Sequence, residues 1–155
     1  MSIAAETPLQ DDIRAMVERL NAHLQPLSPP QFQFQLTVEQ MAGADATVFV
    51  ARDEAGAAVA MGSLKVHDTR TGEVKRMFCD PHVRGRGLGR AILDVIEARA
   101  RDLRLSRLVL ETGATPGFEP AWALYEGAGF TRCASAILDY PDSEYSRFYE
   151  KSLSS

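Results

Sequence analysis

The sequence is poor in cysteine and histidine, the residues from which disulfide frameworks and zinc sites are built. Its 155 residues include two cysteines, Cys79 and Cys133, and three histidines, His23, His67 and His82. Two cysteines are too few for a disulfide framework or a four-ligand zinc site, and the histidines lack the spacing of metal ligands. We therefore expect reduced thiols that pack in the core, no bound metal and a cytoplasmic protein.

Long apolar runs are also missing. The longest uncharged runs, such as residues 46–51, fall far short of the roughly 20 residues that a membrane-spanning helix needs. The N-terminal stretch 1–14 has no basic start followed by an apolar segment, and its first charged side chain is that of Glu6. We expect neither a membrane span nor a secretory signal.

The chain carries little net charge, −4 overall, but the charge is unevenly distributed. Residues 75–107 contain nine Lys or Arg against four Asp or Glu, which leaves a clear negative excess on the rest of the chain. An acidic protein whose basic segment carries a single aromatic, Phe78, is poorly suited to bind nucleic acid. One local basic segment instead favours a small phosphate-bearing ligand.

The composition is that of an ordinary globular domain, and the length fits one domain over 1–155. Apolar residues at helical spacing predict helices, and β-branched runs between turn residues predict strands. The predicted helices cover 10–24, 38–42, 88–103 and 120–128; the predicted strands cover 46–53, 57–68, 73–79, 107–111, 131–137 and 146–153, with a loop over 26–37. This order indicates a single α+β domain on one mixed, twisted sheet.

A glycine-rich loop, RGRGLGR over 84–90, joins the third predicted strand to the next helix. Glycines let the backbone turn so that successive N–H groups point at one spot, and the free N–H groups of a helix start add partial positive charge. Arg84, Arg86 and Arg90 add full charges. The loop therefore predicts a pyrophosphate site, with a plain solvated turn as the alternative.

Two common phosphate motifs are excluded. A dinucleotide fingerprint that begins at Gly85 requires a glycine at position 90, where Arg90 stands, and no Gly-Lys-Ser/Thr sequence occurs anywhere in the chain.

Four linked motifs resemble a known family. Arg84, Gly87 and Gly89 form an R-x-x-G-x-G pattern after the strand EVKRMFCDP, and LETG at 110–113 and ALYEGAGF at 123–130 follow. In order and spacing, over about residues 38–153, the chain resembles the GCN5-related N-acetyltransferase (GNAT) superfamily. Its opening helix and closing residues are similar to the bacterial YsnE-like small-molecule branch.

The resemblance implies a mostly antiparallel sheet of six to seven strands with about four helices, whose strands splay apart at the cofactor site. Acetyl-CoA would lie between the strands that part near 77–79 and 108–111, with its pyrophosphate on 84–90. The implied cofactor-binding residues are Met77, Phe78, Cys79, Arg84, Gly85, Arg86, Gly87, Leu88, Gly89 and Arg90. An asparagine that many relatives carry before the ALYE-type helix is missing from 113–120, which puts the pantetheine contacts there in doubt.

Two catalytic residues follow from the same resemblance. Tyr125 corresponds to the tyrosine that relatives place beside the thioester sulfur as general acid. Without the resemblance, we would interpret this tyrosine as an ordinary half-buried core residue. Glu73, eleven residues before Arg84, stands where some members carry a glutamate general base, acting directly or through water. Alternatively, Glu73 faces solvent and pairs with Lys75. The N–H groups near Met77 and Phe78 would polarise the thioester carbonyl.

The predicted function is acetyl transfer from acetyl-CoA to a primary amine of a small or amino-acid-like molecule, directly within a ternary complex. The alternatives are a protein N-terminus or lysine as acceptor, and a non-catalytic acyl-CoA sensor. Acceptor choice would lie in 25–36 and 137–146. There Phe32, Phe34, Tyr140 and Tyr145 would form an aromatic wall, while Lys75 or Arg76 could hold a carboxylate. No nucleic acid or membrane partner is expected, and an exposed strand edge could form a homodimer.

Overall fold

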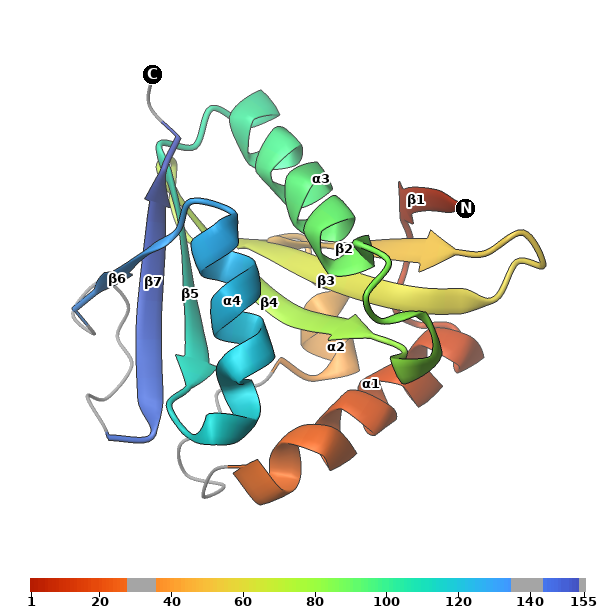
Figure 1. Cartoon of the computed structure of the whole chain (residues 1–155). Helices are drawn as coiled ribbons and strands as arrows, with labels where there is room; N and C mark the ends of the chain where they lie inside the picture. The colour runs from red at the N-terminus through yellow and green to blue at the C-terminus, as the bar shows by residue number, and fades with distance from the viewer. Residues whose placement is uncertain (28–35, 135–143, 154–155) are drawn as a thin grey trace.

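The computed structural model describes residues 1–27, 36–134 and 144–153 (Figure 1). Within these residues one sheet of seven strands has the order β1-β2-β3-β4-β5-β7-β6. Its strands are β1 (Ser2–Ala5), β2 (Ala46–Arg52), β3 (Ala58–Val66), β4 (Thr71–Cys79), β5 (Arg107–Gly113), β6 (Thr131–Cys133) and β7 (Ser146–Ser152). All neighbouring strands run antiparallel except β4 and β5, which are parallel.

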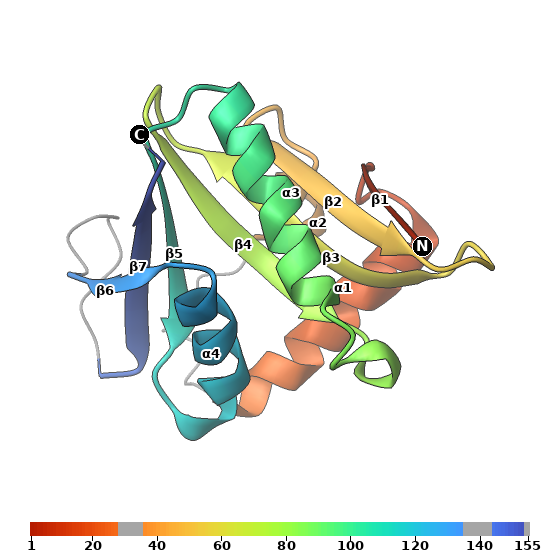
Figure 2. The ribbon, with the colours of Figure 1, turned by 45° about the horizontal axis from the view of Figure 1, so that its top comes forward.

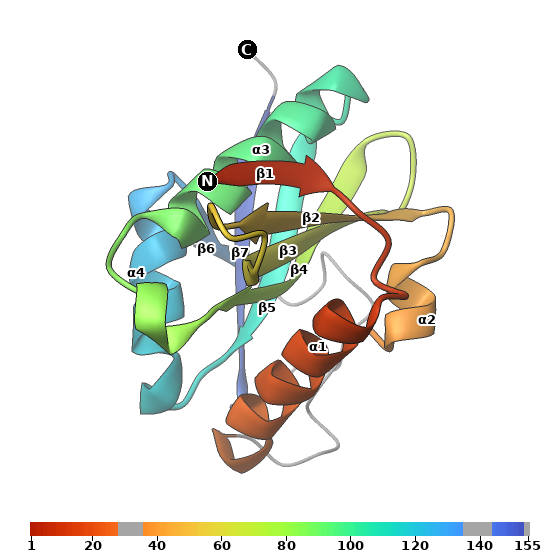
Figure 3. The same cartoon turned by 90° about the vertical axis from the view of Figure 1, so that its right-hand side faces the viewer.

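Helices cover both faces of this sheet, as Figure 3 shows with α3 above the strands and α1 below them. They are α1 (Asp11–Leu24), α2 (Val38–Met41), α3 (Leu88–Asp102) and α4 (Glu119–Gly127), with short 3-10 turns η1 (Gln25–Leu27), η3 (Pro81–Val83) and η4 (Pro116–Phe118). The apolar stripe of α1 packs with α2 on one face, and α3 and α4 pack on the other. The sheet therefore separates two cores, since each helix buries only one stripe.

Strands β4 and β5 pair only at their first residues. The register joins Thr71 to Arg107, Gly72 to Leu108 and Glu73 to Val109, and the described residues contain no later pair between the two strands. Beyond these pairs β4 and β5 diverge, which opens a wedge in the sheet (Figure 2). Beyond Glu73 and Val109, the backbone N–H and C=O groups on the facing edges of β4 and β5 therefore do not hydrogen-bond to each other.

A β-bulge interrupts β4 inside this wedge. Ser63 pairs with Lys75 and Met61 pairs with Phe78, so two residues of β4 lie opposite the single Gly62. Arg76, in the bulge, has a left-handed φ of 57°. The bulge breaks the alternation of the strand, because one extra residue shifts all later side chains to the other face.

Most predicted elements are present with bounds shifted by one or two residues, and the α+β fold with its mixed, mostly antiparallel sheet is confirmed. The strand β1 was not predicted. The strand predicted over 131–137 ends at Cys133, and 135–137 lie outside the described residues, as do 28–35 of the predicted loop. None of the described helices has the length and apolar character that crossing a membrane requires.

Candidate active site

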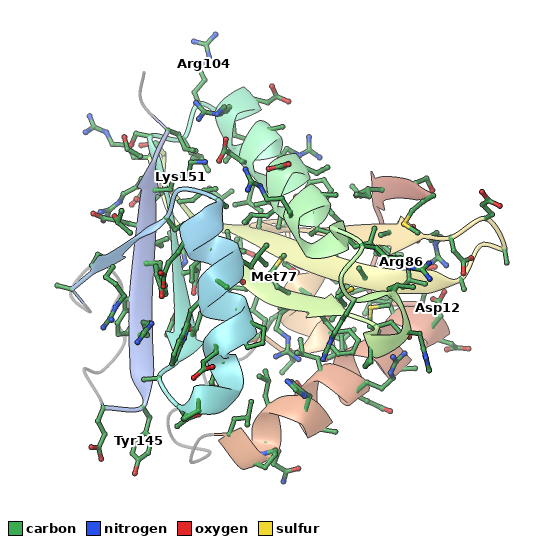
Figure 4. The ribbon with its side chains drawn as sticks, in the orientation of Figure 1. Asp12, Met77, Arg86, Arg104, Tyr145 and Lys151 are labelled. Atoms are coloured by element: carbon green, nitrogen blue, oxygen red, sulfur yellow. The ribbon has the colours of Figure 1, made fainter. Side chains whose placement is uncertain are left out.

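The parted ends of β4 and β5 border a cleft of about 480 Å³, which extends from α1 to α4. The residues that line it, here called the cleft residues, are Leu20, His23, Leu24, Glu73, Val74, Lys75, Arg76, Met77, Phe78, Cys79, Arg84, Gly85, Gly89, Glu111, Thr112, Gly113, Gly117, Phe118, Pro120, Ala121, Leu124 and Tyr125. Figure 4 shows Met77 in the space between α3 and α4. The cleft thus brings together the wedge, the start of the glycine-rich loop and the predicted catalytic residues.

The glycine-rich loop ends directly on α3. Gly85 and Gly87 have φ values of 81° and 77°, and Gly87 is the N-cap of α3, a 15-residue helix. Positive φ is the conformation that glycine adopts at little cost. The free N–H groups of the first helical turn therefore lie beside the cleft, as an anion site requires.

The predicted phosphate-loop residues fall into two groups. Arg84, Gly85 and Gly89 line the cleft, whereas Arg86, Gly87, Leu88 and Arg90 do not. The Leu88 side chain is buried in the core, and Arg86 lies on the exposed loop before α3 (Figure 4). The Arg90 guanidinium donates to Asp94 Oδ1 at 3.0 Å and to the Gly127 carbonyl at 3.1 Å, so its side chain ties α3 to α4.

Replacing Gly87 by valine is expected to raise the acetyl-CoA dissociation constant at least ~10-fold, about 1.4 kcal/mol. A Cβ at Gly87 would meet nothing within 4 Å, so the penalty comes from the φ of 77° and falls on the loop geometry. Isothermal titration measures the affinity. Gly56→Val is the matched control, because Gly56 has a φ of 84°, equally open surroundings and a place in the distant β2–β3 turn. If both variants bind acetyl-CoA with equal affinity, the loop is not part of the cofactor site.

Tyr125 lies on α4 and is buried, at 6% exposure. Its ring packs against Phe130, edge-on with centroids 5.8 Å apart, and against Tyr149 at 6.3 Å. Burial, together with the nearby Glu111 carboxylate, raises the pKa of the Tyr125 phenol above its ordinary value. A phenol held in this way stays protonated at neutral pH, which is the state that a general acid needs.

The indole of Trp122 fixes the position of α4 against the end of β5. Its Nε1–H lies 3.1 Å from Thr112 Oγ1 and 3.0 Å from the Gly113 carbonyl oxygen. The guanidinium of Arg147 stacks 3.6 Å from the centre of the indole ring. Where the expected asparagine is missing, Gly117 and Phe118 line the cleft instead.

Glu73 is almost fully buried, at 1% exposure, so the expectation that it faces solvent is wrong. Its Oε1 lies 2.7 Å from His67 Nε2, and its Oε2 lies 3.2 Å from Lys75 Nζ. The predicted contact with Lys75 is therefore confirmed. Burial with two basic partners satisfies the general rule that buried carboxylates are paired.

A second carboxylate, Glu111, completes the site and was not predicted from the sequence. Leu108 and Leu110 of β5 pack in the core shared with α3 and α4, so Glu111 points to the opposite face, towards Glu73 and Lys75. The pKa of Glu111 is raised to about 7, mainly by burial and to a smaller degree by the charge of Glu73, while Lys75 and the Ser146 hydroxyl partly offset the rise. The signal in the sequence that could have revealed this residue is a charge placed directly after the apolar residues 108–110.

Both cysteines are free and half-buried. Cys79 lines the cleft, where burial raises the pKa of its thiol, Arg84 opposes this shift and Asp80 adds to it. A raised thiol pKa reduces the thiolate fraction and with it the nucleophilicity. Cys79 is therefore a poor acetyl acceptor.

Some predicted acceptor residues lie elsewhere. Phe32, Phe34 and Tyr140 fall outside the described residues, and Tyr145, directly before the first residue of β7 (Figure 4), is not among the cleft residues. Within the ranges that the structure describes, no three His, Cys, Asp or Glu side chains gather as metal ligands.

Comparison with known proteins agrees with this geometry. The profile of the Acetyltransferase (GNAT) family matches residues 13–130. An IAA acetyltransferase of Azospirillum brasilense is 37% identical over 99% of this chain and 98% of its own length, and the uncharacterized N-acetyltransferase YsnE of Bacillus subtilis is 35% identical over 92% and 97%. A solved structure from Klebsiella pneumoniae subsp. pneumoniae superposes with a TM-score of 0.80 at 31% identity, over 98% of this chain and 97% of that one.

The chain belongs to the GNAT acetyltransferase family and is similar to its YsnE-like bacterial branch. It is an acetyl-CoA-dependent N-acetyltransferase.

Proposed function

We propose that this chain, as one domain over 1–155, transfers the acetyl group of acetyl-CoA directly to the primary amine of a small, amino-acid-like molecule within a ternary complex. The observation that carries the proposal is the cleft itself. A tyrosine and two carboxylates line one opening in the sheet, whose wall continues into the glycine-rich loop.

The cleft residues fit acetyl-CoA in two ways. The loop offers Arg84 and the N–H groups at the start of α3 to the pyrophosphate. The unpaired edge of β4 offers N–H groups near Met77 and Phe78 to the thioester carbonyl. Bound there, acetyl-CoA supplies the activated acetyl group and a thiolate leaving group.

Two groups carry out the proton transfers on either side of the reacting carbon, namely the Glu73–Glu111 pair and Tyr125. The Glu73–Glu111 pair accepts the proton of the incoming amine, directly or through water, because only a neutral amine carries the lone pair for attack. As the C–N bond forms and the C–S bond breaks, the nitrogen releases its second proton to solvent, and Tyr125 donates its phenolic proton to the departing sulfur. Solvent then restores the protonation of both groups.

A thermal-shift screen with acetyl-CoA, followed by free-thiol detection over an amine library, tests the proposal. We expect acetyl-CoA to raise the melting temperature, because a ligand that binds only the folded state stabilises it. We expect thiol release with small amines that exceeds release with lysine-containing or N-terminal peptides. Stabilisation without thiol release for any amine would instead favour an acyl-CoA sensor, and preference for peptides would favour a protein acceptor.

A further inference from the structure

Resting on the proposed function, we infer that the acceptor carries a carboxylate as well as its amine, and that the guanidinium of Arg76 binds this carboxylate. Arg76 would thus determine substrate specificity on the α1 side of the cleft.

Arg76 is a buried cation with little to balance its charge. Its exposure is 7%, and its described hydrogen bond runs from Nη2 to the neutral side-chain oxygen of Asn21 on α1. The buried Nε–H has no partner among the described residues. Burial lowers the pKa of Arg76 to about 10, and no carboxylate contributes to that shift.

Such an arrangement is expensive for the fold, since a buried charge normally has a counter-ion. The carboxylates nearest in the chain are engaged elsewhere: Glu73 pairs with Lys75 and His67, and Asp80 pairs with Arg19 at 2.7 Å. A guanidinium group with free N–H donors is well matched to a ligand carboxylate, whose two oxygens accept two parallel N–H···O hydrogen bonds. The unpaired charge is therefore explained if a ligand brings the counter-ion.

The β-bulge places this guanidinium in the cleft. Without it, Lys75 and Arg76 would point to opposite faces of β4. The bulge and the left-handed φ of Arg76 allow its side chain to reach α1, on the same face as Lys75. Of the two residues that the sequence offered for a carboxylate, the structure thus favours Arg76, because Lys75 is paired with Glu73.

Spacing along β4 limits the size of the acceptor. Glu73 and Arg76 are three residues apart, no more than about 10 Å along an extended strand. A molecule that places its amine at the carboxylate pair and its carboxylate at Arg76 is therefore of amino-acid dimensions.

The test compares three primary amines that carry a carboxylate with their carboxamides: glycine, β-alanine and L-phenylalanine against glycinamide, β-alaninamide and L-phenylalaninamide. For each pair the acid-to-amide ratio of kcat/KM is measured in the wild type and in Arg76→Met. Comparing the two ratios cancels the intrinsic difference in reactivity between the two amines. We expect the ratio to fall at least about 30-fold in Arg76→Met, as when one partner of a buried charge pair is removed. Arg76→Lys should recover part of the ratio, and Arg14→Met, at an exposed site on α1, should leave it at the wild-type value.

Thermal stability separates recognition from a structural role. Methionine keeps the apolar stem and tolerates the same φ, so removing the unpaired charge should leave the melting temperature of Arg76→Met unchanged or higher. A lower melting temperature, together with an equal loss for acids and amides, would overturn the inference. So would an increase in the acetyl-CoA dissociation constant as large as the loss in kcat/KM.

A binding measurement keeps this inference separate from the proposed activity. With coenzyme A bound, the NMR signal of the Arg76 Nε–H should shift saturably on addition of the carboxylate-bearing amines and not with their amides. This result would support carboxylate binding even if no amine released thiol, in which case the proposed transfer alone would fail. Equal shifts with acids and amides, or none with either, would overturn the role of Arg76.

Discussion

Replacing Tyr125 by phenylalanine is expected to slow acetyl transfer in a single turnover on the order of 10²-fold or more, because it removes a positioned general acid. The phenylalanine ring keeps the contacts with Phe130 and Tyr149. Acetyl-CoA affinity and thermal stability should therefore change little. Rapid-quench measurement of the first turnover avoids masking by slow product release.

Tyr149→Phe is the matched control for this experiment. The ring of Tyr149 belongs to the same cluster, but its hydroxyl donates to Glu126 Oε2 at 2.6 Å and does not line the cleft. Its single-turnover rate should stay close to the wild-type rate. If Tyr125→Phe also retains the wild-type rate, the hydroxyl is not the general acid.

The second large effect concerns the carboxylate pair, and its signature is the pH profile. Glu73→Gln and Glu111→Gln should each lower kcat/KM on the order of 10²-fold near neutral pH, the usual contribution of a general base. The loss should shrink at alkaline pH, where more of the amine is already neutral. Steady-state profiles of all three proteins with one amine measure this.

The two variants should differ on the acidic side of the profile. In the wild type, kcat/KM should fall as the pH drops below about 7, where Glu111 becomes protonated. Glu111→Gln should abolish this limb. Glu73→Gln should move it to lower pH, because the negative charge of Glu73 raises the pKa of Glu111, whereas the positive charge of Lys75 lowers it. Profiles of unchanged shape in both variants would assign the two carboxylates a structural role.

The sequence predicted the helices and the inner strands well because their patterns are local. The apolar spacing of α1 and α3 gives each helix one buried stripe. The strand β1 was missed because it has only four residues, most of which are exposed. Its conformation depends on antiparallel pairing with β2, from Ser2 with Arg52 to Ala5 with Phe49, which no local pattern encodes.

The site was predictable as far as family motifs reach. The loop 84–90 could be singled out from its glycines and arginines, and Glu73 and Tyr125 from the resemblance to the family, whereas Glu111 acquires its raised pKa only when β5 meets β4. Arg76 was equally hidden, because the alternation of β4 does not reveal the bulge that turns its side chain towards α1. Charges gathered from different strands depend on tertiary structure, and a single sequence does not show them.

The most direct test of direct transfer is the intact mass of the protein after incubation with acetyl-CoA alone and then with an active amine. We predict no acetylated protein in the first step, since the cleft thiol of Cys79 has a raised pKa and a small thiolate fraction. In the second step, free thiol and N-acetylated amine should appear in equal amounts. Stoichiometric acetylation of Cys79 that disappears when the amine is added would contradict direct transfer in a ternary complex.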